Sequence, residues 1–507
     1  MLSGDNGILQ RTTEAKEKSE RAQIIENSRL DILAQIAENK GEDISEEQFK
    51  TVLNKYFYDV PNTIPDDLSD LNLTSIKGYT VKGNEIYDGK LKASTPGLYY
   101  AGTNDLIMSW EKLLESNGNP PMLSVSNGNL SKASFNINTQ VKLIVDKTVT
   151  SIGYMGGISQ LEEIKLPDTV TTIYPGALGG NNNLKTVTIL SGNIGSGAFG
   201  GCPSIEKVVF GDKVTSIGVG AFNGCSSLKK IDIPDSVTNL GDESFKGCTS
   251  LEEIKIGNGG VNISGGAFGN DNSIKTIEIK AGTLGAGAFS GKPDLETIKL
   301  GKDVNISASS IFGGCSELSD VYLEEGIASI GEWCFGGCKK LTNINIPNSV
   351  TSIGDRAFQN CPLNTIFINS SNIGKEAFEY TSLTSITIGP NVRNIGEKAF
   401  NSLEVDDKVV DIKIQEGLTK IGECAFANYS KYPALNITLP NTLLSIEKEA
   451  FLNCRMTEIK IPKSVTSIAN DAFKNCINLQ NIIIEKDSTL TAPSNKWGAN
   501  NATVIQE

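Results

Sequence analysis

Most of the chain repeats three apolar patterns in a fixed order. Each repeat contains a segment of the form L-x-x-I-x-I, one of the form V-T-x-I-G and one of the form A-F-x-x-C, as in Leu228–Ile233, Val214–Gly218 and Ala221–Cys225. The phenylalanine returns at intervals of 20 to 26 residues, most often 23. Its positions, including one leucine, are Leu178, Phe199, Phe222, Phe245, Phe268, Phe289, Phe312, Phe335, Phe358, Phe378, Phe400, Phe426, Phe451 and Phe473.

These patterns predict short strands joined by turns. In L-x-x-I-x-I the last two apolar residues enclose a polar one, which is the period of a strand with one buried face. V-T-x-I-G predicts a second short strand that ends at a glycine turn, and A-F-x-x-C predicts a turn of helix. One such unit cannot bury its apolar side alone, so the units must stack. We expect a β-rich repeat solenoid of about sixteen coils over residues 139–490 and a C-terminal cap or tail over residues 491–507.

The cysteines follow the same repeat. Of the ten cysteines, Cys334 directly precedes a repeated phenylalanine, and Cys424 stands in an otherwise polar position that we expect to face solvent. Free cysteine is among the most often buried residue types, so we expect the repeated thiols to fill the core. Some disulfides remain an alternative, and a metal or redox site is a weaker one because no ligand spacing is maintained. The other eight cysteines lie three residues after a repeated phenylalanine: Cys202, Cys225, Cys248, Cys315, Cys338, Cys361, Cys454 and Cys476.

The N-terminal region has a different character. Residues 7–41 predict one charged helix with a narrow apolar stripe, and residues 45–58 predict a second short helix. In residues 74–100 apolar and polar residues alternate in short stretches separated by glycines, which predicts a small strand meander. We therefore expect a small α+β domain over residues 1–105, and a linker or a cap of the solenoid over residues 106–138.

Composition excludes several classes of function. The net charge is −13 and the pI is about 4.9, so no basic surface is available for nucleic acid. The chain has no histidine, which removes serine–histidine and cysteine–histidine nucleophile pairs as well as histidine-ligated zinc. No apolar run is long enough to span a membrane, so membrane attachment would need an anchor that this chain lacks. We expect no enzymatic activity and no cofactor.

The departures from the repeat indicate where a ligand could bind. Two adjacent coils are lengthened after phenylalanine, over residues 401–410 and 427–435, and such loops often carry binding. Exposed aromatic residues at regular strand or turn positions are favoured anchors of interfaces. The alternative is that the insertions are tolerated surface variation. The candidate ligand-binding residues are Tyr322, Trp333, Phe367, Glu404, Asp406, Asp407, Tyr429 and Tyr432.

The repeat resembles the BspA-like leucine-rich repeat. The segment INIPNSVTSIGDRAFQNCPL, which ends at Leu363, carries most of the family pattern, and the resemblance covers about residues 139–490. It implies a right-handed, curved solenoid on a bacterial or protist surface, used for adhesion and protein binding, without catalytic residues. The segment LSGDNGILQRTTEAKEKSERAQIIE is similar to the part of type IV pilin-like proteins of Gram-positive bacteria that follows their membrane anchor.

Two functions follow as hypotheses. The first is a non-catalytic cell-surface protein, held in a Gram-positive envelope, that binds a protein or a host glycan through the solenoid. The alternative is a minor pilin-like structural subunit that carries the solenoid as cargo. In either case we expect a ligand to contact the coils that contain the lengthened loops, because regular coils present mainly well-solvated charges.

Overall fold

The structure is a computed structural model of the whole chain. It describes residues 149–403, 409–429 and 435–507 in full, and before them eight strands between residues 80 and 145. The chain divides into two units, of which the second contains residues 149–159 and 165–507. The helices expected over residues 7–41 and 45–58 lie outside the described residues, so the helical part of the N-terminal domain stays a prediction.

The described N-terminal strands are short and mostly antiparallel. β1, β2 and β3 form an antiparallel sheet, in the place where the sequence predicts a strand meander. β6 and β7 pair antiparallel within the segment expected to be a linker or cap. The strands are β1 (Thr80–Lys82), β2 (Glu85–Tyr87), β3 (Lys92–Ala93), β4 (Leu98–Ala101), β5 (Leu106–Ile107), β6 (Met122–Ser126), β7 (Asn129–Ser134) and β8 (Val141–Val145).

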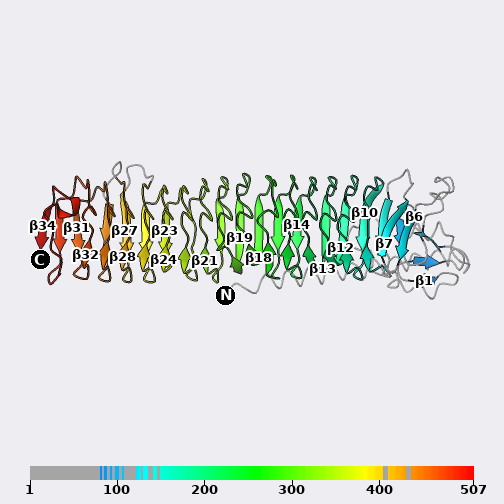
Figure 1. Ribbon diagram of the computed structural model, residues 1–507, viewed down its shortest axis with the longest axis horizontal. Coiled ribbons are helices and arrows are strands. Elements are labelled where there is room, and N and C mark those ends of the chain that lie inside the picture. Colours follow the sequence, from blue (N-terminus) through cyan, green and yellow to red (C-terminus); the bar gives the residue numbers. More distant parts are fainter. Residues whose placement is uncertain are drawn as a thin grey trace, which may run out of the picture. The chain divides into compact units, whose positions relative to one another are not determined.

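The second unit is the expected solenoid, in which the L-x-x-I-x-I segments form a first series of strands (Figure 1). Within each sheet successive strands pair in parallel, and equivalent residues of adjacent repeats lie opposite one another. The series is divided between β20 and β23 and between β29 and β31. The strands of this series are β10 (Leu161–Leu166), β12 (Thr186–Ile194), β13 (Lys207–Ile217), β14 (Lys230–Ile233), β16 (Glu253–Ile256), β18 (Thr276–Leu284), β19 (Thr297–Asn305), β20 (Asp320–Leu323), β23 (Thr365–Ile368), β25 (Ser385–Ile388), β27 (Val410–Ile414), β29 (Leu435–Thr438), β31 (Glu458–Ile461), β33 (Asn481–Ile484) and β34 (Thr503–Gln506).

The V-T-x-I-G segments form a second series of short parallel strands. Each strand of this series follows the first-series strand of its coil. In β12, β13, β18 and β19 the chain runs through both series without a break. The remaining strands of the second series are β9 (Ser151–Ile152), β11 (Thr172–Ile173), β15 (Asn239–Leu240), β17 (Val261–Ile263), β21 (Ser329–Ile330), β22 (Ser352–Ile353), β24 (Asn372–Ile373), β26 (Asn394–Ile395), β28 (Lys420–Ile421), β30 (Ser445–Ile446) and β32 (Ser467–Ile468).

The A-F-x-x-C segments are successive turns and not the helical turns that the sequence predicts. In a representative coil, Gly220 and Gly224 both have positive φ, at 60° and 76°. These two left-handed residues flank the phenylalanine and interrupt right-handed helix. One short 3-10 helix, η3 (Lys496–Gly498), occurs among the described residues, in the C-terminal segment that adds strand β34 to the last coil.

The phenylalanine rings form one continuous stack through the core. From Phe199 to Phe473, each ring lies parallel to the next, with centroids 5.0 to 5.7 Å apart. All of these rings are fully buried. The stack confirms that the repeated phenylalanine is a core residue, and it makes the core continuous from coil to coil.

The repeated cysteines are core residues, as expected, and they also make hydrogen bonds. All ten cysteines are free and buried. Each thiol three residues after a phenylalanine donates to the carbonyl at the phenylalanine position of the preceding coil, as Cys454 does to Phe426 at 3.0 Å. Lys292 and Tyr429 replace cysteine at this position and donate to the equivalent carbonyls of Phe268 and Phe400. Most occupants of this position therefore donate to the preceding coil, although their chemistry differs. Leu403, which is apolar and buried, and Thr381, whose hydroxyl donates to the Phe378 carbonyl of its own coil at 2.8 Å, do not.

Asp271 is a further occupant of this position. Its side chain is fully buried, and neither carboxylate oxygen has a hydrogen-bond partner among the described residues. Burial raises the pKa of Asp271 to about 7, against the lowering effect of the Lys292 ammonium in the next coil. Burial also raises the pKa of the Cys248 thiol in the preceding coil, so that neighbour is uncharged. A protonated Asp271 has an O–H to donate as its neighbours do, whereas the ionised form has none.

The donor role predicts different costs for two substitutions of Cys454. Cys454→Ala removes the donor to the Phe426 carbonyl, whereas Cys454→Ser keeps a donor of similar size. We expect the alanine variant to be less stable than the serine variant by about 1 kcal/mol, because a buried carbonyl loses its partner. Urea unfolding of both variants measures the difference. Equal stability would show that the thiol acts as apolar filling alone.

Asp271 predicts a pH dependence of stability. Between the unfolded pKa of 3.8 and the folded pKa of about 7, the folded state keeps a proton that the unfolded state has released. The free energy of unfolding should therefore fall as the pH rises through this window. Asp271→Asn should remove that part of the slope and be more stable than the natural protein at pH 8. Urea unfolding at pH 4 to 8, with the exposed Asp232→Asn as control, tests this, and an unchanged slope would contradict it.

Candidate ligand-binding surface

The middle position of the first strand series forms an outward-facing row. Strand pairing places Asp232 beside Lys255, Lys255 beside Glu278, and Glu278 beside Lys299. These side chains alternate in charge, as expected for a surface ladder, and each such exposed pair contributes little to stability. From Asp232 to Lys299 the regular coils therefore present a row of solvated charges at this position.

The outward row changes character after Lys299. The next strand places Tyr322 beside Lys299, whose ammonium lies 5.9 Å from the centre of the tyrosine ring. Tyr322 is 56% exposed, and Phe367, at the same position two coils later, is 43% exposed. Asn345 stands between them in the row and is also exposed. Tyr322 and Phe367 thus occupy the outward positions that the sequence predicts for them, and they share one face of the solenoid.

The sheet of the first series is interrupted between these two aromatic residues. The segment 343–346 forms no strand, so β20 and β23 belong to different sheets. The Asn364 N–H still donates to the Thr342 carbonyl at 3.0 Å. Within the part of the chain that the structure describes, no backbone bond is formed by the N–H groups of residues 343–346. We call this interruption, residues 343–346 with the flanking Tyr322 and Phe367, the seam.

The seam is confined to one side of the coils. In the second series β22 pairs with both β21 and β24. The Phe335 and Phe358 rings remain stacked at 5.4 Å. On the open side, Leu323 and Ile344 are half-buried where regular coils bury their apolar residues. The core therefore continues across the seam while one surface of the solenoid is left without its hydrogen-bond ladder.

Trp333 lies apart from Tyr322 and Phe367. It follows β21 on a turn of the second series, with φ of 52°, and its side chain is half-buried. Its indole covers two glycines: a Cβ added to Gly336 would lie 2.7 Å from Cδ2, and one added to Gly313 would lie 2.6 Å from Cδ1. The ring thus packs against the backbone of its own and the preceding coil, and the structure does not join it to the seam.

Five of the candidate ligand-binding residues predicted from the sequence lie in the two lengthened loops. Tyr429 is 1% exposed, and its hydroxyl donates to the Phe400 carbonyl at 2.8 Å. The expectation that Tyr429 is an exposed contact residue is therefore wrong, because it fills the donor position of its coil. Glu404, Asp406, Asp407 and Tyr432 lie outside the described residues, so their contact with a ligand stays a prediction.

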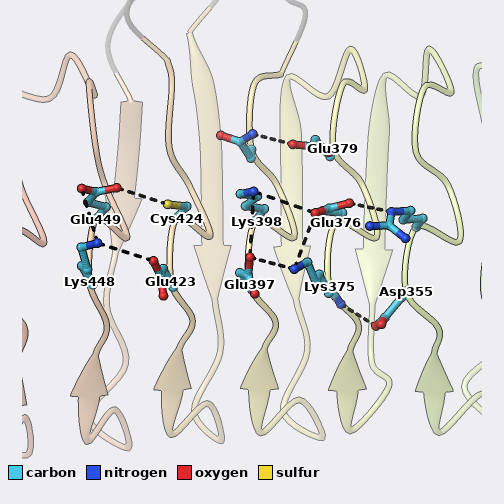
Figure 2. Close-up of polar contacts among 12 residues, drawn as sticks. Asp355, Lys375, Glu376, Glu379, Glu397, Lys398, Glu423, Cys424, Lys448 and Glu449 are labelled. Carbon is cyan, nitrogen blue, oxygen red and sulfur yellow. Dashed lines mark hydrogen bonds and ion pairs between the residues drawn. The ribbon is translucent and has the colours of Figure 1, made fainter.

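Charged side chains on the turns just before the phenylalanine pair with one another from coil to coil and form a row (Figure 2). Glu376 is mostly buried, and its Oε2 accepts a 2.6 Å hydrogen bond from Arg356 Nε. Lys398 also approaches Glu376, and Lys375 pairs with Glu397 at 2.9 Å. The carboxylate of Glu376 raises the pKa of the Arg356 guanidinium. Because each cation faces a carboxylate, this row acts as an internal brace between coils.

Cys424 belongs to this row and is buried, contrary to the expectation that it faces solvent. It lies between Lys398 and Glu449 in the row, and its thiol donates to Glu449 Oε2 at 3.7 Å (Figure 2). Burial and the carboxylates of Glu449 and Glu423 raise the pKa of the Cys424 thiol to about 11. The thiolate needed for nucleophilic or redox chemistry is therefore disfavoured at neutral pH.

A ladder of side-chain amides runs through the later coils and was not found from the sequence. Gln359 and Asn401 both donate to the buried Glu379 carboxylate, at 2.5 and 2.6 Å. Asn428 then donates to Asn401 at 2.8 Å, and Asn453 donates to Asn428 at 2.8 Å. Recurrent asparagine after the phenylalanine was a usable signal, but only stacking of the coils shows that the amides join.

The described residues contain no group of three or more acidic or cysteine side chains placed to hold a metal ion.

A comparison with protein families identifies the repeat. Residues 128–193, 192–319, 306–431 and 404–492 match the BspA type leucine rich repeat region. These matches cover more than half of the chain. The chain belongs to the BspA-type leucine-rich repeat family. No curated protein sequence matches it.

Solved leucine-rich repeat structures resemble the BspA-type solenoid. A leucine-rich repeat protein from Bacteroides ovatus is 22% identical, with 77% of this chain and 98% of that chain covered and a TM-score of 0.45. A leucine rich cell surface protein from Faecalibacterium prausnitzii is 18% identical, with 76% and 95% covered and a TM-score of 0.27. At this level the similarity concerns the kind of fold and carries no argument about function.

The charged brace predicts a stability difference between two glutamates of the BspA-type solenoid. Glu376→Gln should lower the free energy of unfolding by about 1–3 kcal/mol, because a buried acceptor of the Arg356 guanidinium loses its charge. Glu317→Gln, in the exposed pair with Lys340, is the matched control and should cost less than about 1 kcal/mol. Urea unfolding at neutral pH measures both. Equal costs would show that Glu376 is not a brace.

Proposed function

We propose that this protein is a non-catalytic bacterial cell-surface protein that binds a protein or glycan ligand through its solenoid. The observation that carries the proposal is the seam: Tyr322 and Phe367 are exposed aromatic residues on one face, in a row whose other exposed members are charged or polar apart from the aliphatic Val209 and Ile505. Exposed aromatic residues of this kind are enriched at binding sites because they bury a large rigid area on contact.

Family membership supports a binding role. Repeat solenoids present extended surfaces that suit recognition, and leucine-rich repeat regions generally serve as binding scaffolds. The net charge of −13 argues against a nucleic-acid partner. The loop residues Glu404, Asp406, Asp407 and Tyr432, together with Trp333, remain proposed secondary contacts.

We also propose that the protein is displayed outside the cell, in a Gram-positive envelope. The support is the BspA-type repeat together with the resemblance of residues 2–26 to pilin-like proteins. Among the described residues, no helix has the length and apolar character needed to cross a bilayer.

The second candidate function is a minor pilin-like subunit that carries the solenoid as cargo. The observation in its favour is the charged helical pattern of residues 7–41 with its narrow apolar stripe, which fits a helix that packs into a filament. Antibody against the solenoid would then label filaments in electron micrographs of the source bacterium. Uniform labelling of the cell surface would instead favour the first candidate.

Adhesion of beads that carry the full chain tests the first proposal. We expect such beads to adhere saturably to host epithelial cells and free chain to compete, because a folded surface makes the contact. Beads with heat-unfolded chain are the control. Adhesion no stronger than this control, on epithelial cells and on bacterial cells alike, would contradict the proposed function.

A further inference from the structure

The face around the seam is almost free of charge. The outward positions of its four coils hold Asp320 and Tyr322, Asn343 and Asn345, Thr365 and Phe367, and Ser385 and Thr387. Asp320 is the one ionisable acid or base among these eight, and it accepts a 2.7 Å hydrogen bond from the Ser319 hydroxyl. Lys299 and Lys413 stand at the ends of this face. A ligand centred here meets aromatic, amide and hydroxyl groups.

The two aromatic residues are set at a defined separation. Equivalent residues of adjacent coils lie about 4.8 Å apart, so Tyr322 and Phe367, two coils apart, are separated by about 10 Å along the row. Asn345 occupies the same position in the coil between them. The face therefore offers two ring surfaces with a hydrogen-bonding amide in the middle.

The seam adds backbone groups to these side chains. The N–H groups of residues 343–346 form no backbone bond within the described part of the chain, whereas the same segment of regular coils is bonded into the ladder. Unpaired backbone groups at a surface must bond to water or to a ligand. A linear polyhydroxylated molecule that crosses the coils could accept from these groups while its apolar faces cover the rings.

We propose that the seam binds a short, uncharged oligosaccharide. The C–H faces of two sugar rings would pack on Tyr322 and Phe367, whose ring faces carry partial negative charge. The hydroxyls would bond to Asn343, Asn345 and the free backbone groups. An anionic glycan would find compensating charge only at the ends of this face, at Lys299 and Lys413, because the eight outward groups of the four coils are neutral apart from Asp320.

The size of the face favours a sugar over a protein as its occupant. Four coils span about 14 Å, and two outward side chains along each strand span about 7 Å. The resulting area, about 100–200 Å², is far below the roughly 800 Å² that a stable protein partner covers on one side. It suits a ligand of a few sugar rings. The inference rests on the proposed binding function and specifies the ligand at one of its surfaces.

Titration of the full chain with defined hexasaccharides tests the proposal. The probes are β-1,4-linked glucose, β-1,4-linked N-acetylglucosamine and β-1,4-linked mannose, with a heparin hexasaccharide as the charged comparison. We expect at least one neutral probe to bind with an affinity that does not change between 0.05 and 0.5 M salt, because no ion pair is formed. Bound probe should also slow hydrogen exchange in residues 343–346.

Two matched variants locate the binding. Tyr322→Ala with Phe367→Ala removes both rings from exposed positions and should weaken binding at least tenfold, about 1.4 kcal/mol. Tyr174→Ala removes another exposed tyrosine, 46% exposed and away from the seam, and should leave the affinity unchanged. Circular dichroism checks that both variants fold, and the single variant Tyr322→Ala replaces the double one if the latter does not.

Three results would overturn the proposal: no neutral probe binds, heparin alone binds, or the seam variant binds a neutral probe as well as the natural protein does. Bead adhesion shows whether only the sugar-binding proposal is wrong or the proposed binding function is wrong as well. If beads carrying the seam variant adhere normally and no neutral sugar binds, the protein is a binding protein that uses another surface. If the natural chain neither adheres nor binds any probe, both proposals are wrong.

Discussion

The stack of phenylalanine rings is the interaction on which the rest of the solenoid depends. Thirteen rings from Phe199 to Phe473 lie parallel and fully buried, so each coil completes the core of its neighbour. The donor position three residues later ties the same coils together by a hydrogen bond to the phenylalanine carbonyl of the preceding coil. The buried isoleucine, leucine and valine side chains of the two strand series pack around this column and complete the core.

This arrangement leaves the surface free to change without loss of the core. At the seam one sheet opens, yet the rings of Phe335 and Phe358 stay stacked and the second strand series stays paired. The turns before each phenylalanine carry a row of ion pairs around Glu376, and the turns after it carry the amide ladder. A BspA-type solenoid can therefore vary part of its surface while the stacked core continues unchanged.

At the position three residues after the phenylalanine, side chains of different chemistry make the same hydrogen bond. Cys454, Lys292 and Tyr429 differ in size and charge, but each sends one hydrogen to the same kind of carbonyl. Cysteine suits this position because a thiol is small and apolar enough for the core and still has a weak donor. An aspartate there, as at Asp271, has a hydrogen to donate only in its protonated form, so one residue links the stability of the stack to pH.

The sequence by itself determined the solenoid, the identity of its core residues and the outward positions of Tyr322 and Phe367. Periodicity suffices for these features because every coil must bury the same side of the same strand. Three outcomes were decided by the tertiary structure: Tyr429 and Cys424 are buried, the turns are not helical, and the sheet opens at residues 343–346. Each of these depends on how a side chain or a peptide group meets the adjacent coil. Spacing along the chain predicts which residues share a column, but contacts between columns exist only after the coils have stacked.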